Sequence, residues 1–371
     1  MDKRSETWDK LAQSIADGEA VLVLGPEAIP FYSTDGTKQE KTFNELIEER
    51  IFNQIGNDVN FYYRKDNLFQ FRNAAAKQQA MKEIRTTARD ENWIPDAELL
   101  RQIVAIPFPL VLNFNPDKHI FNAFCNYFRE PQFDFYTTKG KLAQANLVYP
   151  DGYNNPLIFN ICGSTLDKYD SVILDYYDLF ELLKNLLIDH GVSEHITRKL
   201  QESDRFILLG FDLEKWYYQL LLHYLNKLDT DPFSNHTQNF PFLSTVSGDT
   251  KEFVMQQFNI QHIAPTRQEF ELLFKACESK GILRKIQNHS DTLEDQIRVL
   301  ITSGKFEESM DMIEKNFENT EEKIDLIQIR SRYVTWLNNK QLGLADTRDL
   351  DIEINKIRYA LLTFAHQLKR S

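Results

Sequence analysis

The sequence contains few cysteines and no long apolar run. Its three cysteines, Cys125, Cys162 and Cys277, form no Cys-x-x-Cys pair, so we expect no metal site of the structural zinc type. Scattered single cysteines are typical of reducing compartments. No stretch approaches about 18 uninterrupted apolar residues, and the N-terminal segment lacks the apolar core of a signal peptide. We therefore expect a cytoplasmic protein with no membrane span.

Positive charge is also in short supply. The 43 Lys and Arg residues are outnumbered by 55 Asp and Glu residues, which leaves a net charge of −12. Nucleic acids and anionic membranes are bound through clustered basic residues, so we expect neither as a partner. Aromatic residues, by contrast, are plentiful, with 27 Phe and 15 Tyr. We interpret them as a Phe-rich core rather than as a special stacking surface.

Four short apolar runs predict strands, at residues 20–25, 108–114, 156–163 and 205–211. Runs that are apolar on both faces suit the centre of a parallel sheet covered by helices. Helical patterns lie between them, so the fold class expected for residues 1–285 is α/β, with a doubly wound, mostly parallel sheet and helices on both faces. Ligands bind such sheets beyond the carboxyl ends of the strands.

The pattern changes after about residue 285. Residues 286–371 contain no strand-like run and predict a small all-α bundle of four amphipathic helices. The third of these helices begins near Glu321, and we expect Ile324, Ile327, Val334 and Leu337 to face inward. The sequence thus predicts two domains, 1–285 and 286–371.

The first predicted strand ends in a loop at the usual position of a phosphate-binding turn. Gly25 opens this loop, but Pro26 lacks a backbone N–H and Glu27 places a carboxylate where an anion would lie. Two like charges about 4 Å apart repel by about 1 kcal/mol even in bulk water. The loop therefore argues against tight dinucleotide binding, and a plain strand-to-helix turn is the alternative.

Polar residues end the next two strands. Asn113 and Asn115 can bind a ribose hydroxyl or form an ordinary Asx turn, and both interpretations stay open. Asn160 and Cys162 end the third strand, where a general base would be expected. Asparagine is no base at neutral pH, and the sequence places no His or Lys beside Cys162 to lower the pKa of its thiol. We expect Cys162 to be buried and inert.

The order of these strand ends resembles the sirtuin-like (silent information regulator) superfamily. FILLGFDLEKWYYQLLLHYL (206–225) and SVILDYYDLFELL (171–183) are similar to segments of bacterial sirtuin-like proteins in anti-phage and conflict systems. The resemblance covers roughly residues 5–280. It implies a Rossmann-like sheet with a pocket for NAD.

The resemblance also implies that much of the catalytic set has been lost. Members that hydrolyse NAD share a GAGxS loop, a TxNxD strand end and an HG motif that carries the base. Gly25 matches the first glycine, and Asn113 matches the catalytic-type asparagine. At the other positions Glu27 replaces a glycine, Ile29 the serine, Asn115 the aspartate, and Cys162 the histidine before Gly163. The zinc-binding cysteine pairs of sirtuin deacylases are absent, which argues against a deacylase.

The C-terminal segments 297–313 and 326–368 resemble the small effector-associated helical domains of bacterial conflict proteins. Such adaptor domains resemble death-fold modules in their logic, and the resemblance implies contact with a like module on a partner protein. A generic four-helix bundle is the alternative.

Three functions follow as hypotheses. The first is a non-catalytic or weakly active pseudoenzyme of a conflict system, with no required cofactor and a protein partner bound through the helical domain. The second is an NAD glycohydrolase that depletes NAD in abortive infection, with Asn113 positioning water or ribose. The third is a self-assembling scaffold that forms a homo-oligomer or filament. If NAD or an NAD-derived nucleotide is bound, the expected lining residues are Gly25, Pro26, Glu27, Asn113, Asn115, Asn160, Gly163, Ser164, Gly210 and Phe211.

Overall fold

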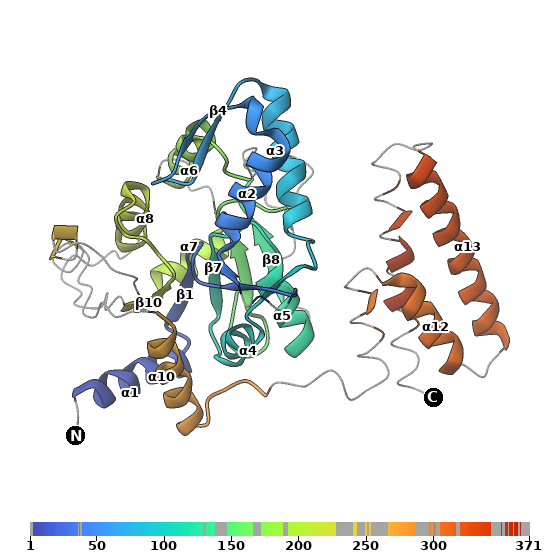
Figure 1. Cartoon of the computed structure of the whole chain (residues 1–371). Helices are drawn as coiled ribbons and strands as arrows, with labels where there is room; N and C mark the ends of the chain where they lie inside the picture. The colour runs from blue at the N-terminus through green and yellow to red at the C-terminus, as the bar shows by residue number, and fades with distance from the viewer. Residues whose placement is uncertain are drawn as a thin grey trace. The chain divides into compact units, whose positions relative to one another are not determined.

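The computed structural model of the 371-residue chain divides into two compact units, Met1–Ile286 and Gln287–Ser371. Each unit is described by itself (Figure 1). The described residues are 3–35, 37, 39–128, 131–137, 147–165, 172–187, 192–227, 240–242, 249–250, 252–253, 266–285, 297, 300–301, 305–316, 320–342, 350, 353–354, 356–358, 360–362 and 364.

A six-stranded parallel sheet forms the centre of the first unit, which confirms the predicted fold class. Its spatial order is β11 (Phe240–Phe242), β10 (Arg205–Leu209), β1 (Ala20–Leu24), β7 (Leu110–Asn113), β9 (Leu157–Asn160) and β8 (Gln132–Phe135). The four predicted runs are β1, β7, β9 and β10. Without the edge strand β8, this is the 3-2-1-4-5 order of doubly wound folds.

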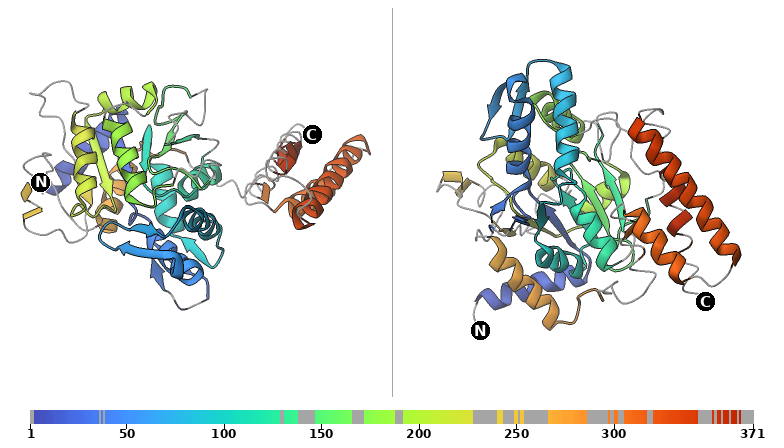
Figure 2. Two further views of the ribbon diagram at one scale, coloured as in Figure 1. Left: turned by 90° about the horizontal axis from the view of Figure 1, so that it is seen from above. Right: turned by 45° about the vertical axis from the view of Figure 1, so that its right-hand side comes forward.

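Helices cover both faces of the sheet (Figure 2). Alternate side chains of each central strand pack into different cores. In β1, Leu22 packs into one core, whereas Val21 and Val23 pack into the other, as the period-two alternation of a strand requires. The first core receives α1 (Lys3–Ala16), α4 (Ala97–Ala105), α5 (His119–Tyr127) and α10 (Thr266–Ser279). The second receives α6 (Tyr176–Leu187), α7 (Glu194–Gln201) and α8 (Trp216–Lys227).

A long insertion separates β1 from β7. It comprises β2 (Phe31–Ser33), β3 (Glu40–Lys41), α2 (Phe43–Ile55), a 3-10 turn (Gly56–Asp58), β4 (Val59–Tyr63), β5 (Leu68–Phe71), α3 (Ala74–Thr87) and β6 (Trp93–Pro95). Strands β3, β2 and β6 form a small antiparallel sheet, and β4 and β5 form a hairpin. These strands and the edge strands β8 and β11 were not predicted from the sequence.

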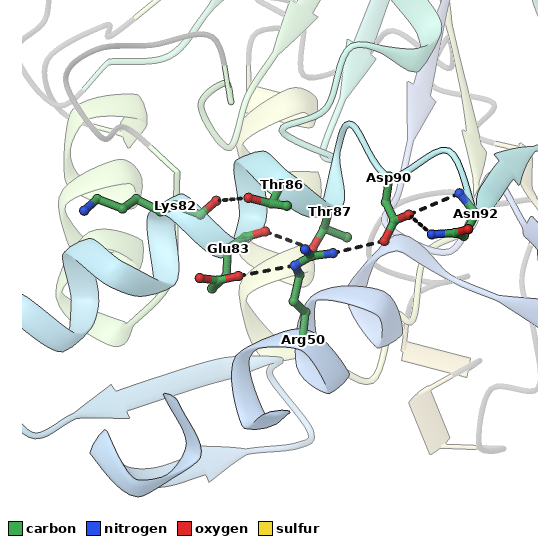
Figure 3. Close-up of polar contacts among 7 residues, drawn as sticks. All are labelled: Arg50, Lys82, Glu83, Thr86, Thr87, Asp90 and Asn92. Atoms are coloured by element: carbon green, nitrogen blue, oxygen red, sulfur yellow. Dashed lines mark hydrogen bonds and ion pairs between the residues drawn. The ribbon is translucent and has the colours of Figure 1, made fainter. Parts of the chain in front are cut away.

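Helices α2 and α3 hold the hairpin in place. Thr42 caps α2 in a full capping box with Glu45. Arg50 of α2 then reaches α3: its Nε donates to Glu83 Oε2 at 3.3 Å, and its Nη1 donates to Asp90 Oδ2 at 3.0 Å (Figure 3). Arg50 therefore links α2 to α3 and to the turn that follows α3. Phe52 of α2 contacts Tyr62 and Phe69 of the hairpin.

The second unit is helical in its described residues. It contains α12 (Phe306–Asn316) and α13 (Thr320–Leu342), and its core comprises Ile297, Ile301, Phe306, Met310, Ile313, Leu326, Ile329, Ile357, Leu361 and Phe364. The predicted long third helix is confirmed. The predicted inward face of that helix is wrong at Ile327 and Val334, which are exposed, while nothing is described of the Ile324 side chain. Among the described residues, no helix is both long and apolar enough to cross a membrane.

Candidate functional site

The candidate site lies where the strand order reverses, between β1 and β10. Neighbouring loops of a doubly wound sheet diverge at this point and leave a crevice for a ligand. The loop Gly25–Ala28 follows β1, and the loop Gly210–Leu213 follows β10. These loops carry five of the residues predicted to line a nucleotide pocket, which are Gly25, Pro26, Glu27, Gly210 and Phe211.

The two loops close onto each other instead of diverging. The N–H of Gly25 donates to the carbonyl of Leu209 at 2.7 Å, and the N–H of Glu27 donates to the carbonyl of Gly210 at 3.2 Å. The N–H of Ala28 donates back to Gly25 at 3.1 Å. Because proline has no N–H, each backbone donor of this turn is either absent or already bonded within the protein.

Glycine makes this close approach possible. A methyl group on Gly25 would lie 2.1 Å from the carbonyl oxygen of Gly210, and one on Gly210 would lie 2.1 Å from the nitrogen of Ala28. Gly210 also has a φ of +73°, in the left-handed region that glycine adopts at little cost. Gly25 thus serves loop-to-loop packing here, in contrast to a glycine that opens a phosphate cradle.

The asparagines of β7 and β9 form one buried network. Asn113 Nδ2 donates to the Asn115 carbonyl at 2.8 Å and to Asn160 Oδ1 at 3.0 Å, and Asn113 Oδ1 accepts from the Asn115 N–H at 3.2 Å. Asn160 Nδ2 donates to the Asp117 carbonyl at 2.9 Å. The three asparagines are buried, so the Asn113 amide is engaged on both its oxygen and its nitrogen.

One acceptor of this network has no partner. Asn115 Oδ1 is buried without a hydrogen bond in the described part of the chain, which is uncommon for a buried polar atom. The Asn115 N–H donates to the side-chain Oδ1 of Asn113, which is the hydrogen bond of an Asx turn. The turn therefore begins at Asn113, and the side-chain oxygen of Asn115 takes no part in it.

Cys162 follows β9 and packs, half-buried, against the second core. Burial raises the pKa of its thiol from 9.0 to about 12. The thiol is therefore neutral at physiological pH and has no proton-accepting capacity there. Gly163 follows with a φ of +86°, and Ser164 is buried.

Three buried aromatic side chains pack together beside these strand ends. Phe114 follows β7, Phe211 follows β10, and Tyr218 comes from α8. Their ring centroids lie 5.0 to 5.6 Å apart in edge-to-face pairs, a favourable arrangement for aromatic rings. All three residues are buried. We call Phe114, Phe211 and Tyr218 the crevice cluster.

A lysine that the sequence did not single out completes the site. Lys215 is buried beside the crevice cluster, with its Nζ 5.8 Å from the centre of the Tyr218 ring. Burial lowers the pKa of Lys215, and the carboxylate of Glu27 acts most strongly against that shift. Reduced hydration in turn raises the pKa of Glu27, opposed by Lys215. The Glu27 carboxylate thus partly offsets the effect of burial on Lys215.

The structure therefore brings the predicted residues together but uses their polar groups internally. Glycine loops and asparagines at strand ends were detectable in the sequence. Lys215, Phe114 and Tyr218 were missed, because one lysine and two aromatic residues next to a strand end or a helix start carry no distinguishing pattern. Across the described residues, no group of three or more His, Cys, Asp or Glu side chains is placed to hold a metal ion.

The second unit, Gln287–Ser371, resembles a known family. Residues 292–369 match the family model of effector-associated domain 11. The C-terminal region is accordingly an effector-associated domain of the conflict-system type, a class that links proteins to partners. No curated protein matches the chain, and the parallel α/β sheet of the first unit has no assigned family.

The effector-associated domain has a conspicuous second face on α13. Tyr333 and Trp336 stack at 5.7 Å on the core side, and Trp336 Nε1 donates to the Leu350 carbonyl at 2.7 Å. On another side of the helix, Ile327 and Val334 are seven residues apart and exposed. The helix therefore presents apolar residues on more than its core side.

Proposed function

We propose that the chain is a conflict-system component whose sirtuin-like α/β unit works without nucleotide turnover and whose effector-associated domain connects it to a partner protein. The observation that carries this proposal is the closed turn after β1. Its three N–H groups, on Gly25, Glu27 and Ala28, are all hydrogen-bonded within the protein, so a pyrophosphate would have to displace existing bonds.

The remaining groups support the same conclusion. A general base is typically worth about 10²–10⁴-fold in rate, and the neutral Cys162 thiol supplies none. The Asn113 amide makes three internal hydrogen bonds, and it would have to give up at least one of them to hold a ribose or a water molecule. Bringing NAD into this crevice would also require displacement of the buried crevice cluster.

The proposal is tested by incubating the full-length chain with NAD and following nicotinamide release, with an active NAD glycohydrolase in parallel. Calorimetric titration of NAD into the chain measures binding separately from cleavage. We expect neither nicotinamide release nor a binding signal.

An Asn113→Ala variant decides between the proposal and its enzymatic alternative. Nicotinamide release that disappears in Asn113→Ala, but persists when the exposed Asn154 is changed to Ala, would establish NAD hydrolysis and overturn the proposal. Binding of NAD without release would overturn only the claim that the crevice is closed.

A further inference from the structure

A second group of aromatic side chains lies on the surface of the first unit and meets the crevice cluster through Tyr217, whose ring centroid is 5.9 Å from that of Trp216 and 4.4 Å from that of Tyr218. Phe61 and Tyr63 lie two residues apart on the same face of β4. Tyr176 and Phe180 belong to α6, and Trp216 is the first residue of α8. Consecutive ring centroids lie 4.8, 4.8, 5.9 and 6.1 Å apart along the series Phe61, Tyr63, Tyr176, Phe180 and Trp216. We call these five residues the surface cluster.

This cluster is accessible to solvent. Phe61 is 54% exposed and Phe180 is 55% exposed, and the adjacent Tyr177 is 72% exposed. Isolated exposed apolar residues are common, whereas contiguous apolar patches mark interaction sites. Phe, Tyr and Trp are also the residue types enriched at protein interfaces.

The cluster is held in place by contacts that do not involve its exposed faces. The hairpin between β4 and β5 is tied to the main body because the Tyr217 hydroxyl donates to the Asp66 carbonyl at 3.0 Å and the Phe69 N–H donates to the Leu174 carbonyl at 2.8 Å. Tyr176 donates its hydroxyl to Asp66. The rings are therefore positioned before any ligand arrives, which lowers the entropic cost of binding.

A cleft of about 440 Å³ opens beside the cluster, lined by Tyr63, Phe69, Phe71, Tyr176, Tyr177, Gln70, Asn73, Ala74, Lys77 and Asp175. Its acceptors are already used. Lys77 Nζ donates to Asp175 and to Asp178 at 2.6 Å each. The other oxygen of Asp175 accepts from the Asp178 N–H, and the other oxygen of Asp178 accepts from the Leu174 N–H.

Its donors, in contrast, are partly unused. Gln70 accepts from the Tyr63 hydroxyl through Oε1 at 3.4 Å, and Asn73 accepts from the Ala76 N–H through Oδ1 at 2.9 Å. Within the described part of the chain, neither of these two amide NH₂ groups donates a hydrogen bond. An ammonium has three N–H donors, and Lys77 uses two. The cleft thus offers donors between aromatic walls.

A ligand complementary to this cleft is rich in acceptors, poor in donors and apolar along its sides. A proline-rich segment has these properties, because each proline keeps its carbonyl but has no N–H. Such segments adopt an extended polyproline II helix with a solvated backbone, and aromatic grooves bind it at low entropic cost.

We propose that the surface cluster and the neighbouring cleft form a docking site for a proline-rich segment of a partner protein. The site belongs to the first unit and shares no residue with the crevice cluster, so it would give the chain a means of engaging a partner in addition to its effector-associated domain. Aromatic rings receive the proline rings, and Gln70, Asn73 and Lys77 donate to carbonyl groups of the segment.

The test uses the full-length chain and an array of fluorescein-labelled 12-residue peptides with proline at varied spacings, with proline-free helical peptides of matched charge. Fluorescence anisotropy measures each affinity. We expect proline-rich members to bind and Tyr177→Ala and Phe180→Ala to weaken binding about tenfold or more, as expected for aromatic anchors. Tyr153→Ala removes an exposed ring outside the cluster and should leave the affinity unchanged.

Three results would overturn the proposal. One is that no proline-rich peptide binds, and another is that the proline-free peptides bind equally well. The third is binding of a labelled oligothymidine that depends on Tyr177 while the peptides fail, since stacked bases would then be the ligand. Thermal unfolding at the wild-type temperature shows that each variant is folded, and because Tyr177 and Phe180 are exposed we expect this for both.

Discussion

Two aromatic groups in the same α/β unit have opposite surroundings. Phe114, Phe211 and Tyr218 are buried where a nucleotide crevice would be, whereas the surface cluster exposes Phe61 and Phe180 to solvent. Both groups use similar edge-to-face or tilted ring contacts. The ring contacts alone therefore do not distinguish the crevice cluster from the surface cluster. The two clusters differ in their burial and in whether the nearby hydrogen-bond donors are already bonded within the protein.

The same contrast holds for polar groups. Around the crevice, the backbone donors after β1 and the amide of Asn113 are engaged within the protein. Beside the surface cluster, the carboxylates are engaged, but the amide donors of Gln70 and Asn73 are not, among the described contacts. The polar groups at the crevice are bonded within the protein, as in a protein interior. The surface cleft keeps donors that a ligand could use, as the proposed docking site requires.

Truncation of a ring in the crevice cluster should lower the free energy of unfolding more than any other change considered. Phe114→Ala would leave a cavity among Phe211 and Tyr218, and we expect it to lower the free energy of unfolding by about 3–5 kcal/mol. Denaturant unfolding of the full chain measures the loss. A loss below about 1 kcal/mol would mean that the crevice is loosely filled and open to ligands.

Glycine substitution tests the closure of the two loops. Gly210→Ala introduces a methyl group 2.1 Å from the backbone of Ala28 and should cost about 3 kcal/mol, from backbone strain and overpacking together. Gly18→Ala is the matched control, because Gly18 has the same φ of +73° and no neighbouring atom within 4 Å. It should cost about 1 kcal/mol. Equal losses would show that the loops are not in close contact.

The asparagine network should contribute less. Asn160→Ala removes the acceptor of Asn113 and the donor to the buried Asp117 carbonyl, which should cost about 2 kcal/mol. Asn154→Ala at an exposed position serves as the control and should change the free energy of unfolding by less than about 0.5 kcal/mol. If both variants lose equally little, the network is not a structural element, and its asparagines are available for a ligand.

Thiol chemistry tests whether Cys162 is inert. Because burial raises the pKa of Cys162 to about 12, its alkylation by iodoacetamide at about pH 8 should be about tenfold or more slower than that of an unhindered thiol. Below the pKa the thiolate fraction rises with pH, so the rate should continue to increase up to about pH 12. Mass spectrometry of the Cys162 peptide follows the reaction. A rate that stops rising near pH 8 would indicate an activated thiol.

The sequence was most informative where side chains are buried on both faces. Strands β1, β7, β9 and β10 were predicted because each is a continuous apolar run. The strand β4, with its exposed Phe61, was missed because its burial alternates irregularly. On α13 the visible stripe of Ile327 and Val334 suggested an inward face, although the core takes Leu326 and Ile329. An apolar stripe on a helix shows that its burial would be favourable. It does not show whether the core of the same domain or another surface covers it.

The sequence located the strand ends, but it did not show how the polar groups at those ends are hydrogen-bonded. Gly25 and Asn113 marked the strand ends correctly, because the carboxyl ends of parallel strands meet at one edge of the sheet. Whether their polar groups are free depends on partners far away in the sequence: Asn160 lies 47 residues from Asn113, and Lys77 lies 98 residues from Asp175. Such pairings are set by the tertiary fold, and no local pattern contains them.

The smallest stability effect is expected at the surface cluster, and it is also the most specific test of the comparison. Phe180→Ala removes a ring that is 55% exposed, so the free energy of unfolding should change by about 0.5 kcal/mol or less. The ring stacks on Tyr176 and lies against Trp216, yet these contacts remain open to water on one side. If Phe180→Ala were as costly as Phe114→Ala, the surface rings would be part of the core and their exposure would have no functional meaning. A small effect of Phe180→Ala on stability would support a role of this ring in binding, because folding would then not depend on it.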